Sequence, residues 1–361
     1  MRLLAQAQRP LIVLGKGAAY AQADNEIRQF VESTGIPFLP MSMAKGLLPD
    51  SHPQSVGLRV RWRWPRRRDH AGRCPVELAA GPRRAAQWSA DATFIQIDIE
   101  ASEFDSNRPI AAPLAGDIGS VITALLDRVQ ELPVIAPTAW TDELAERRAR
   151  NDAAMRQRLA DDPHPMQFHN ALRAVRDVLV QHPDVYVVNE GANALDTARN
   201  VIDMHAPRRR LDSGTWGVMG IGMGYAIAAA VETGQPVVAI EGDSAFGFSA
   251  MEFETVCRYR LPITVVVLNN GGVYRGDEAS PNGADPAPTV LSAQARHDLI
   301  AQAFGGRGYH VTTPTELKAA LNEALTSRDP AIVDCQLDPA AGRESGHLTS
   351  LNPKSAAAPP A

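Results

Sequence analysis

Two short apolar runs, each ending in a polar turn, constrain the fold of this chain most. The run at 236–240 is followed by EGDS at 241–244, and the run at 263–268 is followed by NNGG at 269–272. Between them, the apolar residues of 250–260 recur at helical spacing. A strand, a helix and a strand in this order usually join parallel neighbouring strands through a right-handed crossover. The sequence therefore predicts an α/β fold built on a parallel sheet.

The two polar turns are expected to lie together at one edge of this sheet. Parallel strands end at the same edge, and open α/β sheets bind their ligands there. The Asp243 carboxylate, the Asn270 amide oxygen and the Gly272 carbonyl are oxygen ligands of the kind that Mg²⁺ prefers, and Mg²⁺ usually completes its coordination with phosphates and water. We therefore predict a metal–diphosphate anchor, with ordinary turns after strands as the alternative.

Similar patterns extend over the rest of the chain. Strands are expected at 11–14, 94–99, 185–188 and 331–337, with helices at 21–32 and 118–129 and a charged helix at 141–159. This alternation predicts two doubly wound, Rossmann-like domains with parallel sheets. The expected division is a first domain at 1–130, a linker and helix at 131–164, a second domain at 165–342 and a C-terminal tail at 343–361.

Composition excludes several classes of protein. A net charge of −5 gives no overall attraction to nucleic acid or to an anionic membrane. We find no apolar run long enough to span a bilayer and no signal peptide. Cys74, Cys257 and Cys335 lie far apart in the sequence and fit neither a disulfide framework nor a zinc site. We expect a cytoplasmic protein without nucleic-acid or membrane partners.

The segment 58–88 breaks the pattern. It contains nine arginines and three of the five tryptophans, and it has no helical or strand period. Our preferred interpretation is an altered reading frame, because GC-rich DNA read out of frame yields Arg, Ala, Gly, Pro and Trp. The alternative is a genuine basic insert, such as an arginine-rich nucleic-acid arm. With a central strand lost there, backbone donors and acceptors would stay unpaired, so we expect a damaged first domain.

The two polar turns resemble the thiamine diphosphate motif, Gly-Asp-x followed after a helix by Asn-Asn. In that family the Asp, the last Asn and the carbonyl two residues further on hold Mg²⁺, which holds the cofactor's diphosphate. The resemblance implies that Asp243, Asn270 and Gly272 are the metal ligands. One departure is Ser244, which stands where the motif often has glycine.

A closer resemblance is to the oxalyl-CoA decarboxylase family. It rests on the sequences at 41–50, 189–196, 210–220, 241–249 and 338–346, and it covers most of 1–56 and 91–352. It implies a carboxy-lyase of oxalate catabolism that converts oxalyl-CoA to formyl-CoA and CO₂ with thiamine diphosphate and Mg²⁺, as a homo-oligomer. The alternatives are a 2-hydroxyacyl-CoA lyase and a truncated, non-catalytic remnant that binds the cofactor.

The family resemblance also raises an expectation about activity. Enzymes of this family have a pyrimidine-binding domain, a central domain and a diphosphate-binding domain, and the cofactor lies between two subunits. This chain is expected to open on the central domain and to lack the pyrimidine domain with its activating glutamate. We therefore expect little or no turnover by this chain alone.

The resemblance assigns roles to further residues. Met219 would bend the cofactor, with a place in the core as its alternative role. Tyr274 and Ser345 would orient substrate and intermediate as catalytic residues, the latter from a tail that closes over the site; a half-buried tyrosine and an ordinary flexible tail are the alternatives. Asn193 would line the substrate channel. The other expected cofactor-binding residues are Thr215, Trp216, Gly220, Gly242, Ser244 and Ala245, the last two with backbone N–H groups at a helix start that suit a diphosphate.

A nucleotide site is expected in the first domain. Lys16 lies between two glycines and suits a phosphate contact, and Asp98 ends its strand, the usual place for a ribose-binding acid. The resembled family binds ADP there as an activator. This resemblance implies that Ile99 and Ile118 line the same pocket.

Overall fold

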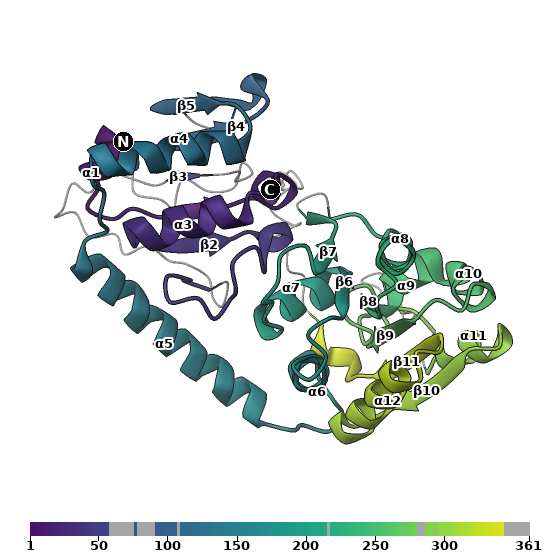
Figure 1. Cartoon of the computed structure of the whole chain (residues 1–361). Coiled ribbons are helices and arrows are strands. Elements are labelled where there is room, and N and C mark those ends of the chain that lie inside the picture. The colour runs from purple at the N-terminus through teal and green to yellow at the C-terminus, as the bar shows by residue number, and fades with distance from the viewer. Residues whose placement is uncertain are drawn as a thin grey trace, which may run out of the picture. The chain divides into compact units, whose positions relative to one another are not determined.

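The computed structural model describes residues 1–57, 76–77, 91–106, 109–214, 217–279, 286–292 and 294–342. The chain forms two compact units. The first contains Met1–Arg158 and Asp203–Arg210, and the second contains Leu159–Ile202 and the described residues from Leu211 onward. Each unit has its own parallel sheet (Figure 1), which confirms the predicted fold class. The role of 131–164 as a linker stays a prediction, and the tail at 343–361 lies outside the described residues.

The first unit is built on a five-stranded sheet in the order β2-β1-β3-β4-β5. Apolar side chains of the helices α3 and α4 pack with those of β1 and β4 in one buried cluster. Asp117 begins α4 by accepting the N–H of Ser120 at 2.9 Å, and Gly35 ends α3 with a φ of 64°. The elements are α1 (Arg2–Ala5), β1 (Ile12–Leu14), α2 (Lys16–Tyr20), α3 (Asp24–Thr34), β2 (Phe38–Pro40), η1 (Ser42–Ala44), β3 (Val76–Glu77), β4 (Ile95–Asp98), η2 (Ala101–Glu103), β5 (Ala112–Ala115), α4 (Ile118–Glu131) and α5 (Thr138–Ala160).

The prediction that this sheet has lost a central strand is wrong. Val76 pairs with Ile12 of β1 and with Ile95 of β4, so β3 occupies the central position. Two residues are enough to bridge these neighbours, because the ladder depends on backbone N–H and C=O groups rather than on side chains. The rest of 58–88 lies outside the described residues.

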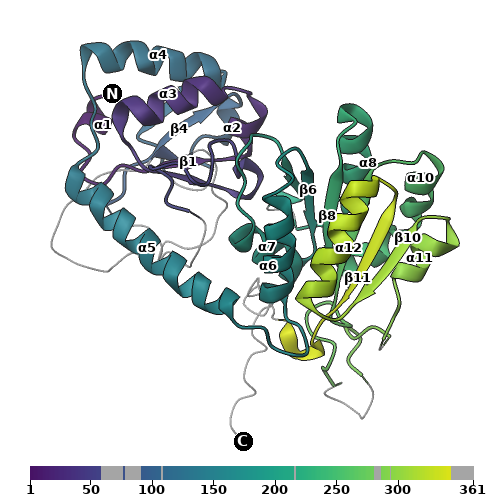
Figure 2. The same cartoon turned by 60° about the horizontal axis from the view of Figure 1, so that its bottom comes forward.

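The second unit is built on a six-stranded sheet in the order β10-β11-β9-β8-β6-β7. Every residue of β9 is buried, as expected for a strand covered on both faces. Helices α6, α7 and α12 lie on one face and α8 to α11 on the other (Figure 2). The elements are α6 (Phe168–Leu179), β6 (Tyr186–Glu190), α7 (Ala192–Val201), β7 (Arg210–Asp212), α8 (Gly222–Thr233), β8 (Val237–Gly242), α9 (Asp243–Ser249), η4 (Ala250–Glu252), α10 (Phe253–Arg258), β9 (Ile263–Asn269), α11 (Asp298–Ala303), β10 (Arg307–Val311), α12 (Pro314–Ser327), β11 (Ala331–Gln336) and η5 (Pro339–Ala341).

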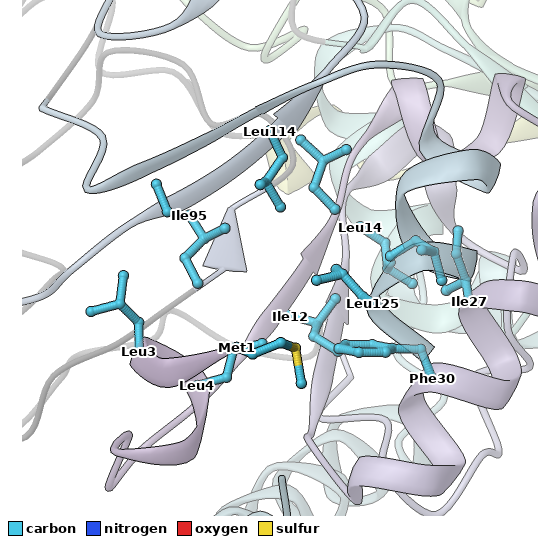
Figure 3. A pocket seen from close by; sticks show the side chains of 13 residues that line it. Met1, Leu3, Leu4, Ile12, Leu14, Ile27, Phe30, Ile95, Leu114 and Leu125 are labelled. Carbon is cyan, nitrogen blue, oxygen red and sulfur yellow. The ribbon is translucent and has the colours of Figure 1, made fainter. Parts of the chain in front are cut away.

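An apolar cavity of about 80 Å³ lies in the first unit (Figure 3). Side chains of α1, α3, α4 and the strands β1, β4 and β5 line it, among them Leu4, Phe30 and Leu114. All of the described residues that line it are apolar, so their side chains offer no acid or base. Within the described part of the chain, no helix is both long enough and apolar enough to cross a membrane.

Candidate functional site

The candidate site lies where the neighbouring strands β8 and β9 end. The two strands are parallel, and their register runs from Val237 opposite Ile263 to Gly242 opposite Leu268. Asp243 follows β8 directly, and Asn270 follows β9 directly. The predicted pairing of these strands is therefore confirmed, and it brings the two polar turns to one edge of the sheet.

The Asp243 carboxylate joins the two turns. One of its oxygens accepts the backbone N–H groups of Gly271 at 2.7 Å and Gly272 at 3.1 Å, and the other accepts that of Ser244 at 2.6 Å. The side chain is only 3% exposed. Burial raises the pKa of Asp243, although the three N–H groups act in the opposite direction. The sheet edge thus fixes this carboxylate before any ligand binds.

The Asn270 side chain is buried and oriented by one contact. Its amide nitrogen donates to the backbone carbonyl of Tyr274 at 2.9 Å. Asn193, in the first turn of α7, donates to the same carbonyl at 3.4 Å. These hydrogen bonds orient the amide group of Asn270: its nitrogen binds the Tyr274 carbonyl, and its oxygen is the atom that can ligate a cation.

Glycines make the turn after β9 possible. Gly271 has a φ of +76°, which favours glycine. A side chain at Gly272 would bring its Cβ to 2.4 Å from the carbonyl oxygen of Arg275. The tight path keeps the backbone of this turn next to Asp243.

These groups fit a magnesium ion. A buried carboxylate, a carboxamide oriented through its nitrogen and the carbonyl groups of a close glycine turn are the types of oxygen donor that Mg²⁺ takes. The remaining coordination of Mg²⁺ usually comes from phosphate oxygens and water. The site can therefore hold a diphosphate through a cation.

A second polar cluster was missed by sequence reasoning, which assigned no role to the histidines. The buried Asp334 carboxylate lies 2.9 Å from the amide nitrogen of Asn269 and 3.3 Å and 3.0 Å from the Nδ1 atoms of His297 and His310. Asp298, close enough to share a cation with Asp334 and His310, is already paired with Arg296 through two bonds of 2.7 Å. Since these carboxylates have partners, the cluster is better explained as a support for β9 than as a metal site.

The loop before α8 contains Met219, which is half-buried. Gly220 has a φ of +93°, and a Cβ there would lie 3.1 Å from that of Phe248 in α9. The N–H groups of Gly220 and Gly222 both donate to the carboxylate of Glu190, at the end of β6. No pattern in the sequence pointed to Glu190.

A second buried carboxyl group lies beside Glu190. Glu241 is opposite Glu190 in the register of β6 and β8, and it is 0% exposed. Its two carboxyl oxygens have no hydrogen-bond partner among the described residues. Burial, with a smaller contribution from the charge of Glu190, raises the pKa of Glu241 to about 8. Burial also raises the pKa of Glu190, against the N–H groups of its loop.

Three residues of the expected nucleotide site begin or end elements of the first unit: Lys16 begins α2, Asp98 ends β4 and Ile118 begins α4. Gly17, the residue after Lys16, lies close to Ile118: a Cβ at Gly17 would be 3.5 Å from the Ile118 side chain. Asp98 ends β4 and accepts the backbone N–H of Glu100 at 3.1 Å, whereas Ile99 is 77% exposed. Three expected site residues, Thr215, Trp216 and Ser345, lie outside the described residues.

Comparison with known families gives two matches. The C-terminal TPP binding domain of thiamine pyrophosphate enzymes matches residues 191–335, and the central domain of thiamine pyrophosphate enzymes matches residues 1–125. Asp243, Asn270 and Gly272 fall within the first of these ranges.

Several curated proteins are similar to this chain. An oxalyl-CoA decarboxylase of Escherichia coli (strain K12) is 53% identical over 98% of this chain and 63% of its own length. A 2-hydroxyacyl-CoA lyase of Arabidopsis thaliana is 43% identical over 97% of this chain and 63% of its own length. The 2-hydroxyacyl-CoA lyase 1 of Homo sapiens is 38% identical over 95% of this chain and 62% of its own length. The chain thus spans less than two thirds of each relative.

Proposed function

Since the chain belongs to the thiamine pyrophosphate enzymes, we propose that its second unit binds thiamine diphosphate through a Mg²⁺ ion. Asp243, Asn270 and the carbonyl of Gly272 are the proposed metal ligands. The observation that carries this proposal is the bonding of the Asp243 carboxylate to the backbone of the Gly271–Gly272 turn. That bonding supports the proposal because it joins a buried anion to the turn that contains the other proposed oxygen donors, at the edge where α/β sheets bind ligands.

Further residues of this unit would contact the cofactor. Gly242, Ser244 and Ala245 surround the start of α9, a helix N-terminus that suits a diphosphate. The N–H of Ser244 donates to the Asp243 carboxylate in this structure. Met219 is half-buried on a loop rather than part of the core, which favours contact with the ring portion of the cofactor. The other proposed contacts are Thr215, Trp216, Gly220 and Tyr274. When bound, thiamine diphosphate supplies a carbanion that adds to a carbonyl and an electron sink for the bond that breaks.

We propose oxalyl-CoA as the substrate, with formyl-CoA and CO₂ as products. The greater identity to an oxalyl-CoA decarboxylase, 53%, than to the lyases, 43% and 38%, supports this choice over cleavage of a 2-hydroxyacyl-CoA. Asn193, Tyr274 and Ser345 are the proposed residues that orient the substrate. Asn193 and the backbone of Tyr274 share a hydrogen bond beside Asn270, which supports their place in the site.

Three further proposals concern regulation and context. ADP would bind in the first unit at Lys16, Asp98, Ile99 and Ile118, three of which begin or end elements at one edge of its sheet. The protein would work in the cytoplasm as a homo-oligomer. The remaining candidate is a chain that binds the cofactor without turnover.

The proposal is tested in two steps on the 361-residue chain. Calorimetric titration with thiamine diphosphate should show binding in Mg²⁺ and none in excess EDTA; equal binding in both would contradict the metal anchor. Assays with oxalyl-CoA and with a 2-hydroxyacyl-CoA then separate the decarboxylase from the lyase by the substrate that yields formyl-CoA. Binding without product from either substrate would favour the non-catalytic alternative.

A further inference from the structure

Glu190 holds the loop before α8 by its main chain. It is the last residue of β6 and is 1% exposed. Its two carboxylate oxygens accept the N–H groups of Gly220 and Gly222, one each, and the N–H of Ile221 also faces it. Gly222 is the first residue of α8. The carboxylate therefore satisfies donors that the start of a helix leaves unpaired, where the helix dipole favours a negative charge.

The loop has little room to move away from this position. A Cβ at Gly222 would lie 2.5 Å from Glu190 Oε2 and 2.4 Å from Glu241 Oε1. On the other side, a Cβ at Gly220 would lie 3.1 Å from that of Phe248. The backbone of 220–222 is thus confined between two carboxyl groups and an aromatic residue, and Met219 directly precedes it.

The two ends of a bound cofactor would then depend on adjacent strands. Glu190 ends β6 opposite Glu241 of β8, and Asp243 follows only two residues after Glu241. Asp243 would bind the diphosphate end through the metal ion, whereas Glu190 binds the backbone of the loop that contains Met219. The contacts of each carboxylate are to different backbone segments, 271–272 for Asp243 and 220–222 for Glu190.

We propose that Glu190 is a positioning residue that fixes residues 218–222 by two backbone hydrogen bonds and so holds Met219 against the ring portion of thiamine diphosphate. This inference rests on the proposed function. It assigns to β6 a part in ring binding that is separate from the metal anchor. A glutamate is required because one carboxylate accepts two N–H groups, whereas an amide offers only one acceptor and turns its own NH₂ toward the second donor.

The test compares two ligands on the 361-residue chain with Mg²⁺ present. Glu190→Gln should raise the Kd for thiamine diphosphate at least tenfold and change the Kd for inorganic diphosphate by less than twofold. The reason is that only the first ligand has a ring for Met219 to contact. Glu190→Asp keeps the charge and both acceptors but is shorter by one methylene, so its effect should be smaller. Glu232→Gln, the same change at an exposed position of α8, is the control and should alter neither Kd.

Hydrogen exchange without ligand gives a second readout. Amides of 219–222 should exchange at least tenfold faster in Glu190→Gln than in the parent, while those of 271–272 keep their rate. Unchanged exchange at 219–222 would overturn the positioning role, even for a chain that binds no cofactor. Faster exchange together with an unchanged Kd for thiamine diphosphate would overturn the link to the ring.

Failure of the proposed function looks different. In that case the parent chain itself would not bind thiamine diphosphate with Mg²⁺. The proposed role of Glu190 in holding Met219 against the ring would then also be wrong. If Glu190→Gln does not fold, Glu190→Asp decides the question: equal ligand affinities and equal exchange in this variant and the parent would contradict the proposal.

Discussion

The Asp243 carboxylate accepts the backbone N–H of Gly271 at 2.7 Å, although 28 positions separate the two residues. One side chain thereby ties the end of β8 to the turn after β9. This contact is the feature on which the proposed metal anchor depends, because it fixes both the charge and the turn that contains the other proposed oxygen donors. Its loss should affect ligand binding more than folding.

Asp243→Asn should remove Mg²⁺-dependent binding of thiamine diphosphate. The amide has no charge and can accept hydrogen bonds through one oxygen only, so the metal loses its anionic ligand. We expect the Kd measured by calorimetry in Mg²⁺ to rise at least 100-fold. Asp277→Asn is the matched control, since Asp277 lies in the same loop region but is exposed and paired with Arg275. Parent-like affinity of Asp243→Asn would show that the cation is held elsewhere.

Gly272→Ala should deform the turn after β9. The new Cβ would lie 2.4 Å from the carbonyl oxygen of Arg275, so the backbone has to shift. We expect a loss of about 1–3 kcal/mol in the free energy of unfolding, as for other overpacked sites, together with weaker Mg²⁺ binding. Urea unfolding and metal titration would measure the two effects. Gly247→Ala, in α9, meets no atom within 4 Å and should be neutral or slightly stabilising.

The free energy of unfolding should depend on pH through the ionisation of Glu241. Burial raises the pKa of Glu241 to about 8 from the usual 4.5, so the folded chain keeps this proton where the unfolded chain has lost it. The resulting stability is complete below the unfolded pKa and is lost as the pH rises through about 8. Between these values the loss is about 1.4 kcal/mol per pH unit.

Glu241→Gln is uncharged at every pH and should therefore flatten this dependence. Urea unfolding of parent and variant in Mg²⁺-free buffer, at several pH values between the two pKa values, would compare the slopes. Glu232→Gln, at an exposed position, should leave the parent slope unchanged. Parallel curves for parent and Glu241→Gln would mean that the Glu241 carboxyl group is ionised in the folded chain.

Asp334→Ala should destabilise the second unit by about 1–3 kcal/mol, the range for leaving a buried hydrogen-bonding group without its partner. Asp334 is 0% exposed, and its loss would leave Asn269, His297 and His310 without their shared acceptor. Asp329→Ala is a suitable control, because Asp329 is exposed and its carboxylate pairs with Arg307 at the surface. Thermal and urea unfolding would measure both variants; a change below 1 kcal/mol in Asp334→Ala would refute the support role.

The central strands of the second unit could be predicted because they are buried on both faces. β8, β9 and β11 consist mainly of consecutive buried residues, and such runs are visible in the sequence. The strands β5 and β10 were not predicted. Both strands lie at sheet edges. β5 alternates between exposed and partly buried residues and includes Pro113, and β10 contains polar residues. Edge strands depend on a neighbour's backbone more than on their own apolar content.

The single helix expected at 250–260 proved to be two short helices, η4 and α10, and a third, α9, directly precedes them. α9 begins directly at Asp243, and the backbone at Ser249, with a φ of −136°, interrupts the path before η4 and α10. The apolar spacing at 250–260 reflects contact with the core, which short helical segments also satisfy. Periodicity alone could not place these breaks.

The site was only partly visible in the sequence. Asp243 and Asn270 could be predicted as candidates because each follows a predicted strand within a known spacing. Glu190 could not, since its partners are backbone N–H groups 30 and 32 positions away, and a main-chain donor leaves no mark on residue type. Asp334 was missed for a related reason: its partners come from β9, β10 and the start of α11.

The apolar cavity of the first unit has a consequence for the behaviour of the chain under hydrostatic pressure. A cavity of about 80 Å³ per molecule corresponds to at most about 50 mL per mole of protein, which is within the range of volume changes that accompany unfolding. Water fills the dry part of this cavity when the surrounding helices and strands separate, so the unfolded form occupies less volume. Compression should therefore open the first unit at lower pressure than a fully packed sheet of the same size would require.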